Sequence, residues 1–213
     1  MKKNLINTAN ILSFSRIFFG LFFLILFLFY KYLNLSNTTI LIVEILTLLI
    51  FIMAIITDGL DGYFARKNNK ITDFGKHLDP LTDSIFFIIV FFTFYLLKLL
   101  PVYFFILIFL RELFMHIFLR PFFKSKGLSL PANKFGKIKT VAQSIASITI
   151  ITFLIFKQLL IILINLNEKI IRIYDFYLKI SAYILFAIVT FLSLFSLSIY
   201  LYQSRKILTK NPL

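Results

Sequence analysis

The carboxylates of this chain are few, and most of them gather in one stretch. Five of the nine acidic residues lie between positions 57 and 84, at Asp58, Asp61, Asp73, Asp79 and Asp83. The first two are three residues apart and the last two are four apart, so on helices each pair lies on one face. Carboxylate oxygens are ligands that hard cations such as Mg²⁺ and Mn²⁺ prefer. The spacing therefore predicts that the two pairs share one or two divalent cations.

Small and basic residues stand among these carboxylates. Small residues beside a ligand leave room for phosphates or a base, and arginine and lysine suit anionic groups. The small residues are Gly59, Gly62, Ala65 and Gly75, and the neighbouring cations are Arg66 and Lys76. The stretch thus has the composition of a metal site that receives a phosphorylated ligand.

A plainer interpretation is that the acids pair with lysine and arginine at a solvated helix end. We favour it for Asp73, which lies in a basic loop. It explains the other acids poorly, because aspartates near lipid are costly and repel one another unless a cation compensates them. The candidate site therefore consists of Asp58, Asp61, Asp79 and Asp83.

The elements that must position these residues are membrane-spanning helices. Apolar residues make up 60% of the 213 residues, against about 45–50% in soluble domains. They form runs close to the roughly 20 residues that a span needs. We predict an all-α protein that is a single domain over residues 1–213. Its six spans are expected near 11–30, 39–57, 84–99, 102–119, 138–164 and 178–202, with the second helix continuing to Ala65 and the third starting near Asp79.

The connections between the spans set the geometry of the site. Spans two and three run antiparallel and are joined by about a dozen residues, so the two aspartate pairs can face each other across the helix ends. Pro101 is expected to make a tight turn between spans three and four, and Pro121 to end span four. Residues 165–179 are expected to form a solvated outer connection.

Lysine and arginine are distributed unevenly between the two sides of the predicted spans. One side holds both termini and the loops 66–78 and 120–139, and it carries 15 of these residues, whereas the opposite side carries six. Because basic loops stay in the cytoplasm, both termini and the carboxylates are predicted to be cytoplasmic. The net charge of +14 fits this bias and attraction to anionic lipid headgroups, and no nucleic-acid partner is predicted.

Several classes of site and segment are excluded by composition. The chain has no cysteine, so disulfides, thiolate catalysis and cysteine-based zinc sites are excluded. His77 and His116 alone cannot build a histidine-rich metal site. Lys2 and Lys3 precede an apolar run as in a signal peptide, but no small-residue cleavage site follows and Arg16 interrupts the run. A retained first helix is therefore predicted.

The order of the motif residues is also that of a known family. The frame Asp58-x-x-Asp61-Gly62-x-x-Ala65-Arg66, followed after eight residues by Gly75-x-x-x-Asp79-x-x-x-Asp83, resembles the signature of the CDP-alcohol phosphatidyltransferases. The resemblance implies a metal-dependent, multi-pass enzyme of the bacterial cytoplasmic membrane, with its active site facing the cytoplasm. CDP-diacylglycerol would give its phosphatidyl group to an alcohol and release CMP. A homodimer is implied as well.

The resemblance also assigns roles by position. The metal ligands would be Asp58, Asp61, Asp79 and Asp83, holding Mg²⁺ or Mn²⁺, with two ions expected. The nucleotide would be contacted by Asp58, Gly62, Ala65, Arg66 and Gly75. Asp83 would in addition be the general base for the incoming hydroxyl.

A second set of basic residues is a candidate for recognising the alcohol. Arg111 and Glu112 lie inside span four, about nine residues from its cytoplasmic end, where a charge pair is costly unless it is used. Anchoring and snorkelling of cations at the interface explain such a position poorly. Several cations that face one polar cavity would suit an acceptor carrying its own phosphate. The candidates are Arg111, Arg120, Lys137 and Lys139.

The segments around these cations resemble those of the family members that use sn-glycerol 3-phosphate as acceptor. The similar segments are 7–16, 72–83, 111–112 and 136–143. This chain departs from many of those members at Ser84, where they carry lysine, and at Ala9, where they carry proline. The acceptor that the resemblance implies is sn-glycerol 3-phosphate.

Other functions stay open on the sequence alone. The same chemistry could use inositol phosphate, serine or a second phospholipid as acceptor. A divalent-cation transporter would use the carboxylates as an ion site, but it would place them near the bilayer midplane rather than at one end. A purely structural membrane protein would leave four ordered aspartates unexplained. The roles of Glu44, His77 and His116 are undecided.

Overall fold

Long apolar runs become long helices in this protein, because a backbone in lipid must satisfy its own hydrogen bonds. The computed structural model describes residues 8–67, 73–126 and 134–210, and it leaves the side chains of 8–11, 30, 59–67, 73–77, 124 and 206–210 undescribed. The helices are α1 (Thr8–Tyr32), α2 (Asn37–Lys67), α3 (Asp73–Leu96), α4 (Val102–Leu113), the π-helical turn η1 (Phe114–Leu119), α5 (Arg120–Ser125), α6 (Lys134–Ile164) and α7 (Glu168–Lys210).

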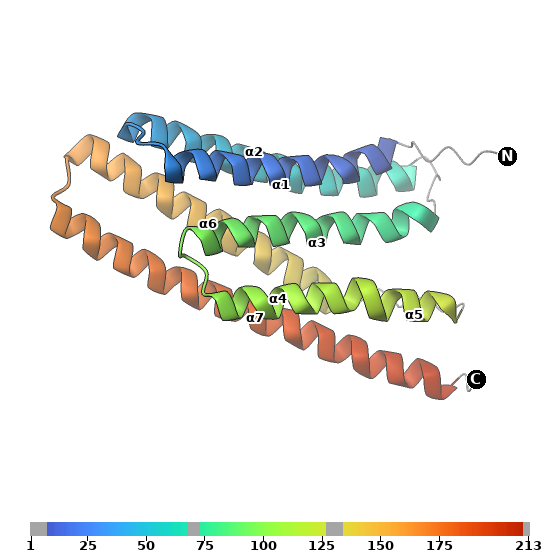
Figure 1. Cartoon of the computed structure of the whole chain (residues 1–213). Coiled ribbons are helices and arrows are strands. Elements are labelled where there is room, and N and C mark those ends of the chain that lie inside the picture. Colours follow the sequence, from blue (N-terminus) through green and yellow to red (C-terminus); the bar gives the residue numbers. More distant parts are fainter. Residues whose placement is uncertain (1–7, 68–72, 127–133, 211–213) are drawn as a thin grey trace.

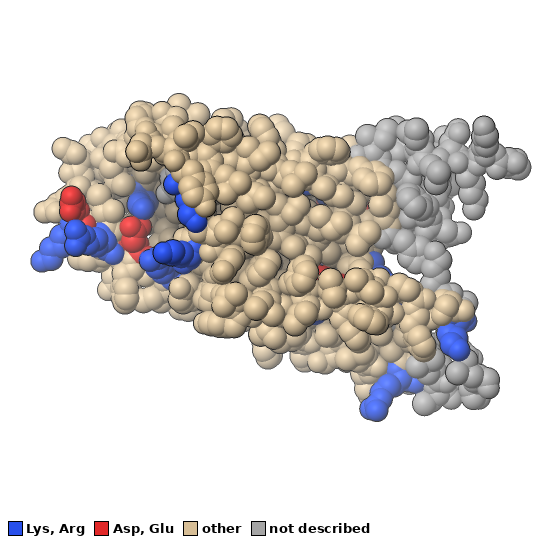
Figure 2. Space-filling model, viewed as in Figure 1, with Lys and Arg blue, Asp and Glu red and all other residues tan. Residues whose placement is uncertain are grey.

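Six helical stretches of the described chain are long and apolar enough to cross a membrane. Five of them lie in α1, α2, α3, α6 and α7, and the sixth runs from α4 through η1 into α5, over Val102–Phe123. The prediction of an all-α protein with six spans is therefore confirmed. On the face drawn in Figure 2, charged side chains gather toward the two ends, and the broad belt between them is almost free of charge.

The spans form two groups that meet through α2, α3, α4 and α6. In one group α1 packs against α2 and α3, and in the other α7 packs against α6 and α4. Contacts of α2 with α6 and of α3 with α4 join the two groups. Helix α1 begins and helix α7 ends at the same end of the bundle (Figure 1), as an even number of spans requires. The last turns of α2 and the first turns of α3, which carry the motif aspartates, lie at this end as well.

Phenylalanine fills the centre of the bundle. The rings of Phe23 on α1 and Phe94 on α3 meet edge to face, with centroids 6.1 Å apart, and those of Phe91 on α3 and Phe186 on α7 do so at 5.4 Å. All four residues are fully buried. Edge-to-face pairs add about 0.5–1.5 kcal/mol each beyond the area that they bury. The core thus fixes α3, the helix of Asp79 and Asp83, against both groups of spans.

The expectation that Pro121 ends span four is wrong, whereas the tight turn at Pro101 is confirmed. The helix passes from α4 through η1 and continues as α5 to Ser125. Pro121 lies in the first turn of α5, directly after the wider π turn, where its missing N–H and its ring are tolerated. Before α4, Lys98 adopts a positive φ of 60° and Pro101 is the N-cap residue.

The expectation that the connection extends over 165–179 is also wrong, because α7 already begins at Glu168; the charged residues Glu168 and Arg172 are exposed, but they lie on the helix. Asn167 Oδ1 accepts a hydrogen bond of 3.0 Å from the N–H of Lys169 and so helps to start the helix. Glu168 and Arg172 then pair at 3.2 Å one turn apart. Charged side chains in the first turns stabilise this helix. A prediction based on apolar runs does not detect these turns, because they are not apolar.

Candidate active site

The aspartates of α2 and α3 converge on α1. Arg16 Nη1 lies 2.7 Å from Asp58 Oδ1, and the same nitrogen contacts Asp83 Oδ1. Ser13 Oγ donates a hydrogen bond of 2.6 Å to Asp79 Oδ1. Because Ser13 and Arg16 are one helical turn apart, one face of α1 meets carboxylates from both neighbouring helices. We call Ser13, Arg16, Asp58, Asp79 and Asp83 the aspartate cluster.

Burial differs between the cation and the anions of the aspartate cluster. The side chain of Arg16 is 2% exposed, whereas those of Asp58 and Asp83 are 46% and 27% exposed. The arginine therefore approaches from the protein interior, and the carboxylates remain open to a ligand that arrives from solvent.

The donor set of this cluster fits a hard divalent cation. Carboxylates from two helices converge at one point, since a single guanidinium nitrogen contacts both Asp58 and Asp83. Among the described side chains, no group of three acids or histidines is assembled as a metal site. Asp61, the fourth predicted ligand, lies on α2 outside the described side chains. The helices α2 and α3 thus bring carboxylates to one cationic group, the Arg16 guanidinium, from two sides.

The other predicted nucleotide-binding residues lie between Asp58 and Asp79 along the chain. Gly62, Ala65 and Arg66 belong to the last turns of α2, and Gly75 to the first turn of α3. Their side-chain surroundings, like those of His77, lie outside the described residues. The two helix ends that carry them lie at the end of the bundle that holds both ends of the chain (Figure 1).

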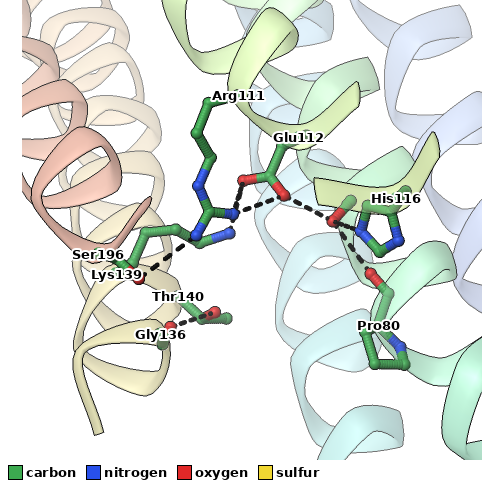
Figure 3. Close-up of polar contacts among 9 residues, drawn as sticks. Pro80, Arg111, Glu112, His116, Gly136, Lys139, Thr140 and Ser196 are labelled. Carbon is green, nitrogen blue, oxygen red and sulfur yellow. Dashed lines mark hydrogen bonds and ion pairs between the residues drawn. The ribbon is translucent and has the colours of Figure 1, made fainter. Parts of the chain in front are cut away.

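A second polar cluster is buried among α3, α4, η1 and α6, and Glu112 lies at its centre (Figure 3). Arg111 Nη1 donates to both carboxylate oxygens, at 2.9 and 3.0 Å, and Lys139 Nζ donates to Oε1 at 2.6 Å. Ser84 Oγ donates to Oε2 at 2.9 Å and lies 2.8 Å from His116 Nε2. We call Ser84, Arg111, Glu112, His116 and Lys139 the ion cluster.

The ion cluster carries more positive than negative charge. Arg111, Glu112 and Lys139 are 6%, 3% and 8% exposed, so one buried carboxylate faces two buried cations. Arg111 Nη2 also donates to Ser196 Oγ on α7 at 3.3 Å. Arg120 is half-buried and within electrostatic range of Arg111 and Glu112. Because an excess of buried charge is costly unless a counter-charge compensates it, this cluster is suited to an anionic group.

The four cations proposed from the sequence to bind the acceptor phosphate are not equivalent in the structure. Arg111 and Lys139 belong to the ion cluster, and Arg120 lies near it. Lys137 is exposed on α6, two residues before Lys139. His116, whose role the sequence left undecided, joins the ion cluster through Ser84.

The two clusters are one residue apart on α3. Asp83 belongs to the aspartate cluster, and Ser84 belongs to the ion cluster. Successive residues of a helix point about 100° apart, so the clusters occupy neighbouring sides of α3 at the same height. A ligand beside the middle of α3 can therefore meet the carboxylates on one side and the cations on the other.

Sequence reasoning did not identify Ser13 and Arg16 as site residues. Arg16 lies within an apolar run, and a charge inside a span is the signal that singled out Arg111. The same signal could have found Arg16. Nothing in the spacing indicates Ser13, since its bond to Asp79 depends on how α1 approaches α3.

Glu44, a buried acid of α2, belongs to neither cluster. It is 1% exposed, and its Oε2 has no hydrogen-bond partner in the part of the chain that the structure describes. Lys157, whose charge acts on it, pairs with Asp175 at 2.8 Å.

Ser84→Ala is expected to destabilise the protein by about 1–3 kcal/mol, because the buried Oε2 of Glu112 and Nε2 of His116 both lose a partner. Thermal unfolding in detergent measures the change. Ser198→Ala is the matched control, since the exposed Ser198 bonds only to Leu194 of its own helix among the contacts described here and should change stability little. Equal stability of the two variants would show that the Ser84 bonds contribute nothing.

Comparison with known proteins identifies the class of this site. A family model described as CDP-alcohol phosphatidyltransferase matches residues 6–171. The matched range includes α1 to α6 and therefore every residue of both clusters.

Curated relatives share one name, CDP-diacylglycerol–glycerol-3-phosphate 3-phosphatidyltransferase. The protein from Bacillus subtilis (strain 168) is 43% identical over 98 residues, which are 46% of this chain and 50% of that protein. The one from Treponema pallidum (strain Nichols) is 38% identical over 101 residues, 47% of this chain and 46% of that protein. The one from Mycoplasma pneumoniae is 41% identical over 97 residues, 46% of this chain and 42% of that protein. The chain spans about half the length of the curated relatives it matches.

Proposed function

The chain belongs to the CDP-alcohol phosphatidyltransferase family, and on this premise we propose that it transfers the phosphatidyl group of CDP-diacylglycerol to sn-glycerol 3-phosphate. The products are phosphatidylglycerophosphate and CMP, so the protein acts in phospholipid biosynthesis. The names of the relatives support this pair of substrates. The observation that carries the proposal is the ion cluster, which places two buried cations around one carboxylate beside the aspartate cluster.

In the proposed reaction a hydroxyl of the acceptor attacks the phosphorus that is attached to the lipid. A new bond forms from this hydroxyl oxygen to phosphorus, and the bond from phosphorus to the phosphate oxygen of CMP breaks. Asp83 takes the hydroxyl proton as general base, a role that a partly exposed carboxylate can perform. CMP then leaves with the electrons of the broken bond.

The donor's diphosphate is held by the aspartate cluster and the end of α2. The residues proposed to hold Mg²⁺ or Mn²⁺, with two ions expected, are Asp58, Asp61, Asp79 and Asp83. Bound there, the ions would neutralise the diphosphate and polarise the phosphorus. The residues proposed to contact the nucleotide are Asp58, Gly62, Ala65, Arg66 and Gly75. The convergence of α2 and α3 carboxylates on one point of α1 supports this assignment.

The acceptor's phosphate is proposed to bind at the ion cluster. Arg111 and Lys139 are buried and preoriented by Glu112, so an anion gains their charge without first ordering their side chains. Arg120 adds a third charge from its half-buried position. Lys137, exposed on α6, would attract the acceptor from solvent. The hydroxyl of an acceptor bound there is proposed to meet Asp83, whose neighbour in the chain, Ser84, belongs to the ion cluster.

The active site is proposed to face the cytoplasm of a bacterial cell, in its cytoplasmic membrane. The support is the distribution of lysine and arginine, with 15 on the side of the termini and six on the other. The last turns of α2 and the first turns of α3, which carry the motif aspartates, lie at the end of the bundle where α1 begins and α7 ends (Figure 1). The lipid tails of CDP-diacylglycerol can stay in the bilayer while its headgroup reacts at this surface.

The purified protein is expected to release CMP only when CDP-diacylglycerol, sn-glycerol 3-phosphate and Mg²⁺ or Mn²⁺ are all present. The measurement is CMP release with labelled CDP-diacylglycerol and a panel of acceptors. Serine, inositol phosphate and a second phospholipid are the competing acceptors, and glycerol tests the need for the phosphate. Release with serine but not with sn-glycerol 3-phosphate would overturn the acceptor assignment. Ion flux in proteoliposomes without CDP-lipid turnover would favour a cation transporter instead.

A further inference from the structure

We propose that Arg16 is a built-in counter-ion of the metal site: it binds Asp58 and Asp83 in the metal-free protein and competes with divalent cations for these carboxylates. The inference rests on the metal site of the proposed function. It assigns a role to a residue of α1 that lies outside the aspartate motif of α2 and α3.

The geometry of Arg16 carries this inference. One nitrogen, Nη1, bridges two carboxylates from two different helices, at 2.7 Å from Asp58 Oδ1 and in contact with Asp83 Oδ1. The side chain is 2% exposed and is the only arginine among the largest fully buried side chains of the described chain. An arginine that served only to anchor the chain at the interface would extend toward water. Arg16 instead directs its charge at the point where the carboxylates converge.

The carboxylates need a cation in every state of the protein. Asp58 and Asp83 lie close enough to touch the same nitrogen, so without a positive charge between them they repel each other. Arg16 supplies that charge when no metal is bound. A divalent cation needs the same oxygens and is repelled by a guanidinium that occupies them. Metal binding and the Arg16 contacts therefore oppose each other, and such coupling is reciprocal.

Two consequences distinguish a competing counter-ion from a residue that only packs α1 against its neighbours. Loss of the Arg16 charge should destabilise the metal-free protein more than the metal-loaded protein, because bound metal replaces the missing cation. It should also tighten metal binding, because the carboxylates no longer need to release a guanidinium. A packing residue would lower stability equally in both states and leave metal affinity unchanged.

The test compares Arg16→Gln with the parent protein in detergent, without substrates. Thermal unfolding is followed in EDTA and at saturating Mn²⁺, and the Mn²⁺ dissociation constant is measured from the electron paramagnetic resonance signal of the free ion. We expect a lower unfolding temperature in EDTA, a smaller difference in Mn²⁺, and Mn²⁺ binding that is tighter by roughly tenfold, within the range of about 5–150-fold that is usual for coupled sites.

Two further variants serve as a control and as a charge-conserving comparison for Arg16→Gln. Arg172→Gln removes an arginine that is 81% exposed and pairs with Glu168 at the opposite end, and it should change neither quantity. Arg16→Lys keeps the charge but lacks the planar fork of arginine, so its values should lie between those of the parent and Arg16→Gln. Arg16→Lys also serves as the test if Arg16→Gln does not fold, because it should still bind Mn²⁺ more tightly than the parent.

The outcomes separate this inference from the proposed function. An equal stability loss in EDTA and in Mn²⁺, or weaker Mn²⁺ binding after loss of Arg16, would overturn the counter-ion role and leave the transferase proposal standing. Absence of Mn²⁺ binding to the parent protein would overturn the metal site and the counter-ion role together. CMP release by the parent protein then decides the transferase proposal separately.

Discussion

Asp83→Asn is expected to lower the rate of CMP release by about 10²–10⁴-fold, the usual contribution of a general base. Asparagine preserves the size of the side chain but cannot take the hydroxyl proton. It also removes one carboxylate from the proposed metal site, so the loss should fall at the upper part of this range. The measurement is CMP release at saturating CDP-diacylglycerol and sn-glycerol 3-phosphate, with thermal unfolding as the check on folding.

Asp175→Asn is the matched control for this substitution. Asp175 also pairs with a cation, Lys157, at 2.8 Å, and its side chain is 42% exposed, but it lies on α7 near the opposite end of the bundle. Its loss should leave CMP release close to that of the parent protein. Full activity of Asp83→Asn would mean that another group accepts the proton, and the role of the carboxylate pair on α3 would have to be reassigned.

The six spans could be predicted because membrane insertion depends on local composition. Each run of apolar residues near the required length became a helix, and the even number of spans follows from them. The predicted helix boundaries were wrong at two places, the end of span four and the start of α7. Pro121 continues a helix because a π turn precedes it, and the charged residues after Asn167 begin α7 because they pair with each other.

The carboxylates of the candidate site could be predicted because spacing encodes which helix face they share. Contacts between segments that are distant in the sequence could not be predicted in this way. Arg16 meets Asp58 across 42 residues of sequence, and Ser84 meets Glu112 across 28. These contacts depend on the angle at which α1 and α4 pack on their neighbours, and a motif contains no information on that angle.

The packing of α3 keeps the carboxylates of the candidate site apart from the buried cations of the ion cluster. A site that binds a diphosphate through metal ions needs carboxylates, and a site that binds an acceptor phosphate needs cations. Close together in lipid, the two sets would pair with each other and block both sites. Asp83 and Ser84 point to different sides of α3, so the carboxylates meet Arg16 of α1 and the buried cations meet Glu112 of α4.

Glu112→Gln is expected to destabilise the protein by about 3–5 kcal/mol, the usual effect of removing one partner from a buried ion pair. The amide keeps the size of the side chain but leaves Arg111 and Lys139, both nearly fully buried, without their counter-charge. Thermal unfolding in detergent measures the loss. Glu168→Gln is the matched control, since Glu168 pairs with Arg172 on an exposed surface and should contribute little.

The same variant tests whether the ion cluster receives an anion. A phosphate that binds beside Arg111 and Lys139 would replace part of the charge lost with Glu112, so sn-glycerol 3-phosphate should raise the unfolding temperature of Glu112→Gln more than that of the parent. Glycerol, which has no phosphate, should raise both equally. If sn-glycerol 3-phosphate and glycerol act alike on Glu112→Gln, the buried cations serve Glu112 alone, and acceptor binding has to be sought at Arg120 and Lys137.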